Sequence, residues 1–327
     1  MSLTLEDIRA AQQRLKPIVI ETPLLSSVKL NAQVSARVYY KPESLQAIGA
    51  FKIRGAYNRI SQFSAVEKAR GVVAFSSGNH AQGVALAAQL LSIKATIVMP
   101  KDAPQIKIAG TQKLGASIVF YDRLSESREE IAANIAQDSG AILVPSYDDL
   151  DVIAGQGTCG LEMAQQFSAI NKVPDILLCP CGGGGLLAGL STAVKALHPQ
   201  VDIYGVEPEH HDDHLQSFKA GKRMPAQRIN NSFCDALLAA MPGEMTWEIN
   251  SKLVAGFVSV SDDDVAYAIS YGFEHLKLVL EPGGAVALAA VLRNKIDLKG
   301  KTIGLIMSGG NIDRQTFIQC LQQYPSP

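Results

Sequence analysis

The sequence predicts an α/β protein of two doubly wound units, each built on an open parallel sheet. From about residue 71 to 144, short apolar runs alternate with segments of helical periodicity, and a second alternation runs from about 155 to 311. Such alternation is typical of parallel strands joined by helices. The 327 residues suffice for two packed units, although an α/β chain of this length can also form one.

The first alternation predicts strands at 72–75, 95–99, 117–121 and 141–144, with helices beginning near His80, Gln105 and Ser125. The second predicts strands at 176–179, 203–206, 257–260 and 302–307. We expect a small domain at 71–147 and a large domain formed by 1–70 together with 148–327. A ligand is expected in the cleft between them, beyond the carboxyl ends of the strands.

Composition excludes some classes of partner. The net charge of −1 gives no electrostatic reason to expect binding to nucleic acid or to a membrane surface, so a small neutral or zwitterionic molecule is the expected partner. No amino-terminal segment reads as a signal peptide, and Pro180 and glycines interrupt the uncharged run 176–194, so we predict a cytoplasmic protein. The five cysteines suit reduced core residues better than a disulfide framework or a soft-metal site.

Four consecutive glycines, Gly182, Gly183, Gly184 and Gly185, stand between the apolar run 176–179 and the helix-like run 186–197. Glycines let backbone N–H groups close around a phosphate, and a helix that starts there adds its positive dipole end. The run matches neither the spaced glycines of a dinucleotide-binding turn nor a nucleoside triphosphate loop. From these residues alone, a plain tight turn explains it equally well.

Lys52 lies in a mostly apolar stretch flanked by glycines, 44–56. Burial disfavours the ammonium form, so such a lysine can become a neutral nucleophile that forms an imine with an aldehyde. A polar segment suited to a carboxylate follows the strand 72–75 and opens a helix: Ser76, Ser77, Gly78, Asn79 and His80. Together with a phosphate cradle, these features describe an amino acid bound to a phosphorylated aldehyde cofactor.

Over essentially its whole length the chain resembles the fold-type II pyridoxal-phosphate enzymes, specifically the threonine/serine dehydratase and serine racemase family. The motifs that carry the resemblance are 49–56, 76–80, 182–185, 281–285 and 308–311. The resemblance implies a tryptophan synthase beta-like fold with pyridoxal 5′-phosphate in the cleft. It also implies a small domain that closes over the substrate, and a homodimer.

The resemblance further implies roles for cofactor-binding residues. Lys52 would hold the cofactor covalently until the substrate amine displaces it, and would then move the Cα proton. Phe51 would pack near the cofactor ring, Asn79 would bind the ring hydroxyl, and Gly182 to Gly185 would hold the phosphate. Ser308 would face the pyridine nitrogen, where a hydroxyl cannot keep that nitrogen protonated as a carboxylate would, which favours β-elimination.

Substrate contacts are implied for Ser76, Ser77, Gly78, Asn79 and His80. Ser77 occupies the position of the serine that acts opposite the lysine in serine racemases, although dehydratases can carry the same motif. Arg128 aligns with a racemase arginine near the substrate, and a solvated helix arginine explains it about as well.

Glu207, the His211 carbonyl and Asp213 have the order of the divalent-cation ligands of racemase-like members. Oxygen ligands suit Mg²⁺ or Ca²⁺. Because His210, His211 and His214 lie in the same stretch, a zinc or nickel site is an alternative, as is a solvated loop before a helix.

We therefore predict an ammonia-lyase that converts L-threonine, L-serine or a related β-hydroxy amino acid to a 2-oxo acid and ammonia. The enzyme alternatives are an amino-acid racemase, which would use Lys52 and Ser77, and a hydroxyaspartate dehydratase. A catalytically silent amino-acid sensor is disfavoured because sensing does not require Lys52. Departures from the family pattern at Leu45, Ala50 and Gly283, and in 234–236, put the substrate's identity in doubt more than the reaction class.

Overall fold

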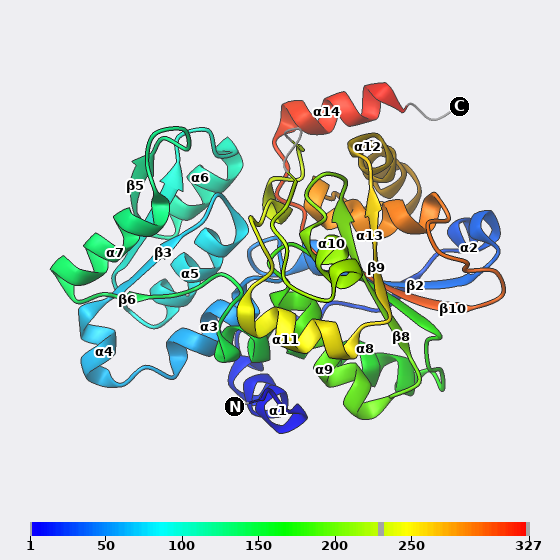
Figure 1. The fold of residues 1–327 in the computed structure, drawn as a ribbon, viewed down its shortest axis with the longest axis horizontal. Helices are drawn as coiled ribbons and strands as arrows, with labels where there is room; N and C mark the ends of the chain where they lie inside the picture. Colours follow the sequence, from blue (N-terminus) through cyan, green and yellow to red (C-terminus); the bar gives the residue numbers. More distant parts are fainter. Residues whose placement is uncertain (1, 228–231, 325–327) are drawn as a thin grey trace.

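The computed structural model describes residues 2–227 and 232–324, which form two open sheets. The larger sheet has six strands in the order β1-β2-β10-β7-β8-β9, and the smaller has four in the order β5-β4-β3-β6. Figure 1 shows the smaller sheet at the left and the larger at the right. Among the described strands, β1 and β2 pair antiparallel and the other pairs are parallel. The predicted fold class is therefore confirmed.

The strands of the smaller sheet are β3 (Val72–Phe75), β4 (Ala95–Pro100), β5 (Ser117–Tyr121) and β6 (Ile142–Leu143). The larger sheet contains β1 (Leu25–Ser26), β2 (Arg37–Pro42), β7 (Ile176–Pro180), β8 (Asp202–Pro208), β9 (Gly256–Val260) and β10 (Thr302–Met307). The structure confirms all the predicted strands with small shifts at their ends. It adds β1 and β2, which the sequence analysis did not predict.

Helices connect and cover the strands. Before β3 lie α1 (Leu5–Leu15), α2 (Val28–Val34), η1 (Glu43–Leu45), α3 (Ile53–Ser61) and α4 (Ala65–Arg70). The smaller sheet carries α5 (Asn79–Leu90), α6 (Gln105–Lys113) and α7 (Arg128–Ser139). The remaining helices are α8 (Leu150–Ala169), α9 (Gly185–Leu197), α10 (Asp213–Ala220), η2 (Asp235–Leu237), α11 (Glu244–Leu253), α12 (Asp262–Tyr271), η3 (Gly272–Leu276), α13 (Pro282–Leu292) and α14 (Arg314–Gln323).

Helix α7 begins at Arg128 rather than near Ser125. The side chain of Ser127 accepts a hydrogen bond from the backbone N–H of Glu130, which makes Ser127 the N-cap. Helix α12 likewise begins at Asp262, where Ser261 is the cap and Asp264 completes a capping box. The acidic run 262–264 thus occupies the first turn, where negative charge meets the positive end of the helix dipole.

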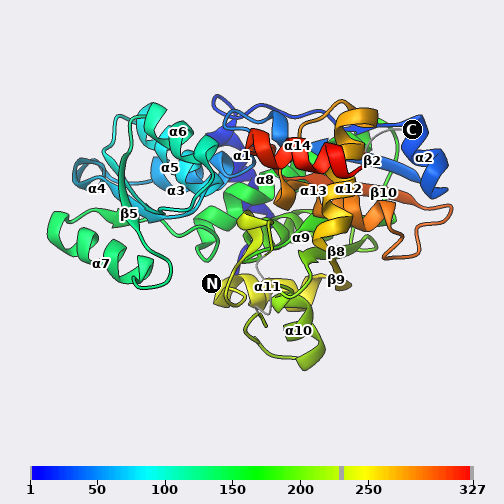
Figure 2. The same cartoon turned by 90° about the horizontal axis from the view of Figure 1, so that it is seen from above.

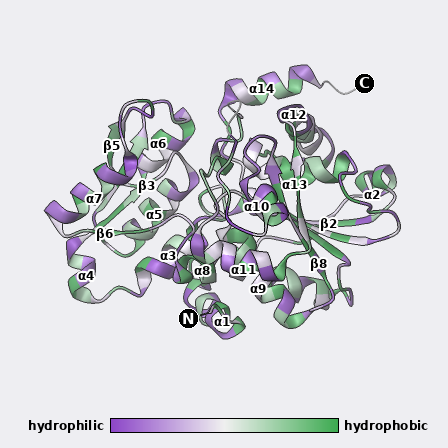
Figure 3. Ribbon diagram, in the orientation of Figure 1, coloured by the Kyte–Doolittle hydropathy of each residue, from purple (hydrophilic) through white to green (hydrophobic). Residues whose placement is uncertain are grey.

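The core of the larger sheet lies on both of its faces. One apolar cluster joins the sheet to α12 and α13, and another joins it to α8 and α9. Every residue of α13 is buried, and this helix is mostly green in Figure 3, whereas the outer helices α7 and α14 carry purple bands. Within the described residues, no helix is both long and apolar enough to span a membrane.

The amino-terminal segment contributes to both sheets. Strand β2 pairs with β10 in the larger sheet, whereas Ile48, Ile53 and Ile60 belong to the apolar cluster of the smaller sheet. Helix α3 therefore lies where the two units meet, which Figure 2 shows from above. The domain boundaries at 70 and 147 stay a prediction. Lys52, the residue before α3, therefore lies where the two units meet.

Candidate active site

One pocket between the two sheets is lined by every residue that the sequence analysis assigned to the cofactor or the substrate. The residues in question are Phe51, Lys52, Ser76, Ser77, Gly78, Asn79, His80, Arg128, Gly182, Gly183, Gly184, Gly185 and Ser308. They come from segments that follow β3, β5, β7 and β10 and from the two residues before α3. Because parallel strands end at the same edge of a sheet, these motifs converge although they are far apart in the sequence.

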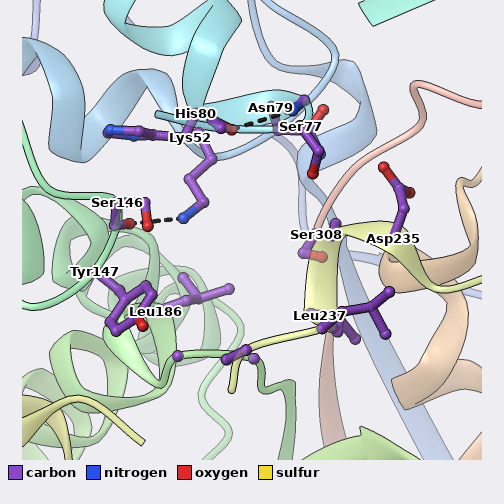
Figure 4. Close-up of a pocket in the computed structure, with 18 of the residues that line it drawn as sticks. Lys52, Ser77, Asn79, His80, Ser146, Tyr147, Leu186, Asp235, Leu237 and Ser308 are labelled. Carbon is purple, nitrogen blue, oxygen red and sulfur yellow. Dashed lines mark hydrogen bonds between the residues drawn. The ribbon is translucent and has the colours of Figure 1, made fainter. Parts of the chain in front are cut away.

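The side chain of Lys52 reaches across the pocket. Its Nζ atom donates a hydrogen bond to the carbonyl oxygen of Ser146 at 2.7 Å and lies 5.3 Å from the centroid of the Phe51 ring (Figure 4). Burial lowers the pKa of Lys52 to about 8. About a tenth of this lysine is therefore an uncharged amine at pH 7, far more than for an ordinary lysine, and this is the form that attacks an aldehyde.

The glycine loop joins β7 to α9, and the helix begins at its last glycine, Gly185. Gly184 has a φ of 92°, in the left-handed region that favours glycine. A Cβ atom at Gly183 would overlap the ring of Tyr147, and one at Gly185 would lie 3.0 Å from the Tyr147 Cβ. A side chain at these positions would therefore either clash with Tyr147 or require an unfavourable backbone conformation. The loop ends at the positive end of the α9 dipole.

The segment 76–79 follows β3 and leads into α5, whose first residue is Asn79. The Ser76 hydroxyl accepts a hydrogen bond from the N–H of Gly78 at 3.1 Å. His80 donates through Nε2 to the carbonyl of Val144 at 3.0 Å, and burial, assisted by the charge of Lys52, lowers the pKa of His80 to about 3. The imidazole is therefore neutral, and the start of α5 offers N–H groups and a positive dipole end to an anion.

Asn79 belongs to a buried polar network. Its Nδ2 atom donates to Glu281 and its Oδ1 atom accepts from the Nδ2 of Asn311 at 2.9 Å. The ammonium of Lys107 lies 2.9 Å from the other oxygen of Glu281 and 2.7 Å from the carboxylate of Asp235. The orientation of the Asn79 amide is consequently fixed by hydrogen bonds on both of its polar atoms.

Ser308 directly follows β10, on the opposite side of the pocket from Lys52 in Figure 4. Its hydroxyl lies 3.4 Å from the carbonyl of Gly283, and its own carbonyl accepts from the N–H of Phe51 at 3.1 Å. The backbone pairing ties the residue before Lys52 to the larger sheet. Ser308 thereby has a fixed backbone at the lining of the pocket.

Two arginines line the pocket from the smaller sheet. Arg128 donates to Glu129 at 2.8 Å and its guanidinium lies 5.1 Å from the centroid of the Phe75 ring. Arg123 donates to Asp102 at 2.7 Å. The side chains of these acidic partners are 59% and 67% exposed, so both ion pairs are solvated, and solvated pairs are weak. Both guanidinium groups can therefore exchange these partners for an anion in the pocket.

The proposed cation ligands lie outside this pocket, behind the glycine loop. Glu207, at the end of β8, is fully buried and accepts hydrogen bonds from the N–H groups of His214 and Leu215 at 2.9 and 2.8 Å. Asp213, the first residue of α10, is fully buried too. Burial and the charge of Asp213 raise the pKa of Glu207 well above its ordinary value. His211 lies in the turn that connects Glu207, near the end of β8, to Asp213 at the start of α10.

No group of three or more histidine, cysteine, aspartate or glutamate side chains arranged for a metal occurs in the described part of the chain. The predicted set differs from such a group, because it contains only two carboxylates, with a backbone carbonyl as the third ligand. Two adjacent buried carboxylates do fit a hard cation, because its charge would relieve their repulsion.

Several pocket residues were missed from the sequence, namely Arg123, Ser146, Tyr147 and Asp235. Lys107, which contacts Asp235, was missed as well. One signal for Lys107 was present in the sequence. Glu281 opens a family motif, and an acid that is buried there needs a positively charged partner. Nothing in the local sequence of α6 marks Lys107 as that partner.

Comparison with known proteins identifies the family. Residues 15–309 match the family described as "Pyridoxal-phosphate dependent enzyme". The L-threonine ammonia-lyase of Thermotoga maritima is 43% identical over 313 residues, which cover 95% of this chain and 76% of that protein. The L-threo-3-hydroxyaspartate ammonia-lyase of Saccharomyces cerevisiae is 42% identical over 316 residues, 96% of this chain and 95% of that one. The structure of maize serine racemase superposes with a TM-score of 0.91 at 37% identity, covering 99% of this chain and 98% of that chain. The chain therefore belongs to the pyridoxal-phosphate dependent enzymes of fold type II, in the family of threonine/serine dehydratases and serine racemases.

Proposed function

We propose that this protein dehydrates and deaminates L-threonine or L-serine, giving a 2-oxo acid and ammonia. The observation that carries the proposal is the position of Lys52. Its amine, with a pKa lowered by burial to about 8, shares one pocket with the glycine loop and with Ser308. The likeness to an L-threonine ammonia-lyase supports the same reaction class.

The pocket residues fit pyridoxal 5′-phosphate. The N–H groups of 182–185 and the start of α9 suit its phosphate, Lys52 suits its aldehyde, and Asn79 and Ser308 suit the ring hydroxyl and the ring nitrogen. When bound, the cofactor supplies the electron sink for breaking bonds at the substrate Cα. Ser308 offers a hydroxyl rather than a carboxylate, so it does not fix a positive charge at the ring nitrogen, which favours elimination.

The remaining roles follow from charge. With the substrate amine bound to the cofactor, Lys52 would be free to act as a base in the same pocket, and it is proposed to take the Cα proton. The segment 76–80 at the start of α5 is proposed to bind the substrate carboxylate. His80 is neutral, so it does not act as a cationic acid, and its proposed role is to orient the substrate.

A substrate panel tests the reaction class. Purified, cofactor-loaded protein is incubated with the L- and D-forms of threonine, serine and 3-hydroxyaspartate while 2-oxo acid and enantiomer ratio are followed. Oxo acid from L-threonine or L-serine supports the proposal, and interconversion of enantiomers without oxo acid would instead show a racemase that uses Lys52 and Ser77. Lys52→Ala should abolish turnover and the absorbance of lysine-bound cofactor, whereas Lys101→Ala, an exposed lysine, should leave both unchanged.

A second candidate is dehydration of 3-hydroxyaspartate, which the two arginines of the pocket favour. Arg123 and Arg128 could bind the extra carboxylate of this substrate in place of their exposed acidic partners. Arg123→Ala and Arg128→Ala should then lower kcat/KM for hydroxyaspartate by about tenfold to a hundredfold, in line with a lost charged hydrogen bond. A comparable loss with threonine would show that the arginines do not select the side chain.

Two further assignments are proposed. Glu207, the His211 carbonyl and Asp213 are proposed to hold Mg²⁺ or Ca²⁺, supported by the adjacent buried carboxylates. A homodimer is proposed as well. The exposed apolar side chains of Leu45 and Val279 lie on neighbouring segments, with Gly310 between them, and a second subunit would cover them. Size-exclusion chromatography with light scattering gives the subunit number, and a monomer would contradict the dimer.

A further inference from the structure

The glycine loop has a second face that the pocket does not use. Helices α10 and α11 meet behind it through the rings of His214 and Trp247, and neither helix contributes a described residue to the pocket lining. Three side chains from these helices meet the loop backbone, namely His214, Thr246 and Asn250. We call this set the back wall.

The back wall holds the loop carbonyls. The Thr246 hydroxyl donates to the Gly183 carbonyl at 2.7 Å, and Nδ2 of Asn250 donates to the Gly184 carbonyl at 3.2 Å. Both carbonyl oxygens are therefore held toward α11, on the side away from the pocket. A loop whose carbonyls are held behind it keeps them from facing an anion in front, which favours binding through N–H groups.

His214 fills the space directly behind Gly184. A Cβ atom at Gly184 would lie 2.7 Å from Nε2 of His214, so the imidazole touches the loop at its left-handed residue. The ring is fully buried, stacks on Phe257 with centroids 5.2 Å apart and planes 25° apart, and tilts against Trp247 at 6.2 Å. It therefore has little freedom to move. Its own backbone N–H is held by the carboxylate of Glu207 at 2.9 Å.

We propose that His214 is a positioning residue that sets the affinity of the glycine loop for the cofactor phosphate. The flat, immobile ring prevents Gly184 from relaxing backwards, so the loop N–H groups keep the spacing that a phosphate requires. The inference rests on the proposed function, in which this loop binds the phosphate of pyridoxal phosphate. It adds a determinant of affinity that lies outside the pocket.

A purely structural role would have a different signature. If His214 only fills the core, its loss lowers stability and weakens the binding of all ligands of the pocket together. If it supports the phosphate cradle, its loss weakens ligands that carry a phosphate and spares those that lack one. Pyridoxal phosphate and pyridoxal differ by this group alone, so the ratio of their dissociation constants separates the two roles.

The experiment uses cofactor-free full-length protein, titrated with pyridoxal phosphate and with pyridoxal and followed by absorbance. His214→Ala should weaken pyridoxal phosphate by roughly tenfold or more while pyridoxal binding changes little. His214→Phe keeps a flat ring and should restore most of the preference. Phe218→Leu is the matched control because Phe218 packs on Phe257 and is not part of the back wall, so it should leave the ratio unchanged.

If His214→Ala does not fold, His214→Leu, which keeps apolar volume without the flat ring, is measured in its place. An unchanged ratio in a folded variant, or equal weakening of both ligands, would overturn the role of His214. Failure of the proposed function looks different, because wild-type protein would then show no preference for the phosphorylated ligand.

Discussion

The ammonium of Lys107 lies 2.9 Å from Glu281, and this contact joins the two halves of the molecule. Lys107 is on α6, beside the smaller sheet, whereas Glu281 is the N-cap of α13, beside the larger one. Both side chains are almost completely buried. Burial alone would lower the pKa of Lys107, but the charges of Glu281 and Asp235 raise it above its ordinary value, so this lysine is charged. Since Glu281 also accepts from Asn79, the contact between the halves reaches the cofactor pocket.

Lys107→Met should destabilise the protein strongly. It leaves Glu281 buried without its cation, and breaking a buried ion pair in this way costs about 3–5 kcal/mol. Urea denaturation measures the loss. Lys113→Met, an exposed position on the same helix, is the control and should change the free energy of unfolding by about 0.5 kcal/mol or less. Equal effects of the two substitutions would contradict the importance of the buried contact.

The rate at which cofactor-free protein captures pyridoxal phosphate should rise with pH up to about 8. Burial lowers the pKa of Lys52 to about 8, and only the neutral amine attacks the aldehyde, so protonation below that pH slows the reaction about tenfold per unit. Above it the rate should level off. Stopped-flow absorbance at a series of pH values measures this. A rate that keeps rising as the pH approaches 10.5, the ordinary pKa of lysine, would show that burial does not lower the pKa of Lys52.

The sequence predicted the sheets and most of the pocket because both leave local signals. Strands such as β3 and β10 are apolar runs with polar or glycine-rich ends, and Lys52 lies in a recognisable motif. Strand β2 is harder to see, since Arg37 and Lys41 interrupt its apolar character. Lys41 is buried because its ammonium is paired with Glu162 at 3.0 Å and donates to the Thr22 carbonyl at 2.7 Å. Lys107 was not predicted as a buried residue for the same reason, since its partners are distant in the sequence. Its partner Asp235 is 128 residues further along the chain, so no local pattern marks the pair.

Ser77→Ala should suppress racemisation more than elimination of the L-substrate. Lys52 alone can remove the Cα proton of that substrate, whereas inversion needs a second group on the opposite face, which Ser77 is proposed to supply. A loss of roughly a hundredfold or more in racemisation is expected for an acid–base group. Paired assays of 2-oxo acid and enantiomer ratio measure both rates, and Ser125→Ala, at an exposed position outside the pocket lining, serves as the control. Equal loss of both rates in Ser77→Ala would mean that Ser77 mainly positions the substrate.

Removal of divalent cations should lower the thermal stability of the protein. Without a cation, the buried carboxylates of Glu207 and Asp213 repel one another, and the turn between β8 and α10 loosens. A cation held at about 100 times its Kd stabilises the folded state by about 2.7 kcal/mol, so chelation should lower the Tm measurably, and added Mg²⁺ or Ca²⁺ should restore it.

Glu207→Gln should weaken this response to cations because the amide removes one negative charge from the site. Asp202→Asn, an exposed position on the same strand, should leave the response intact. Differential scanning calorimetry with and without chelator measures both variants, and metal analysis of the purified protein gives the occupancy. A Tm indifferent to chelator, in protein that carries no divalent ion, would mean that Glu207 only caps α10 through its bonds to His214 and Leu215.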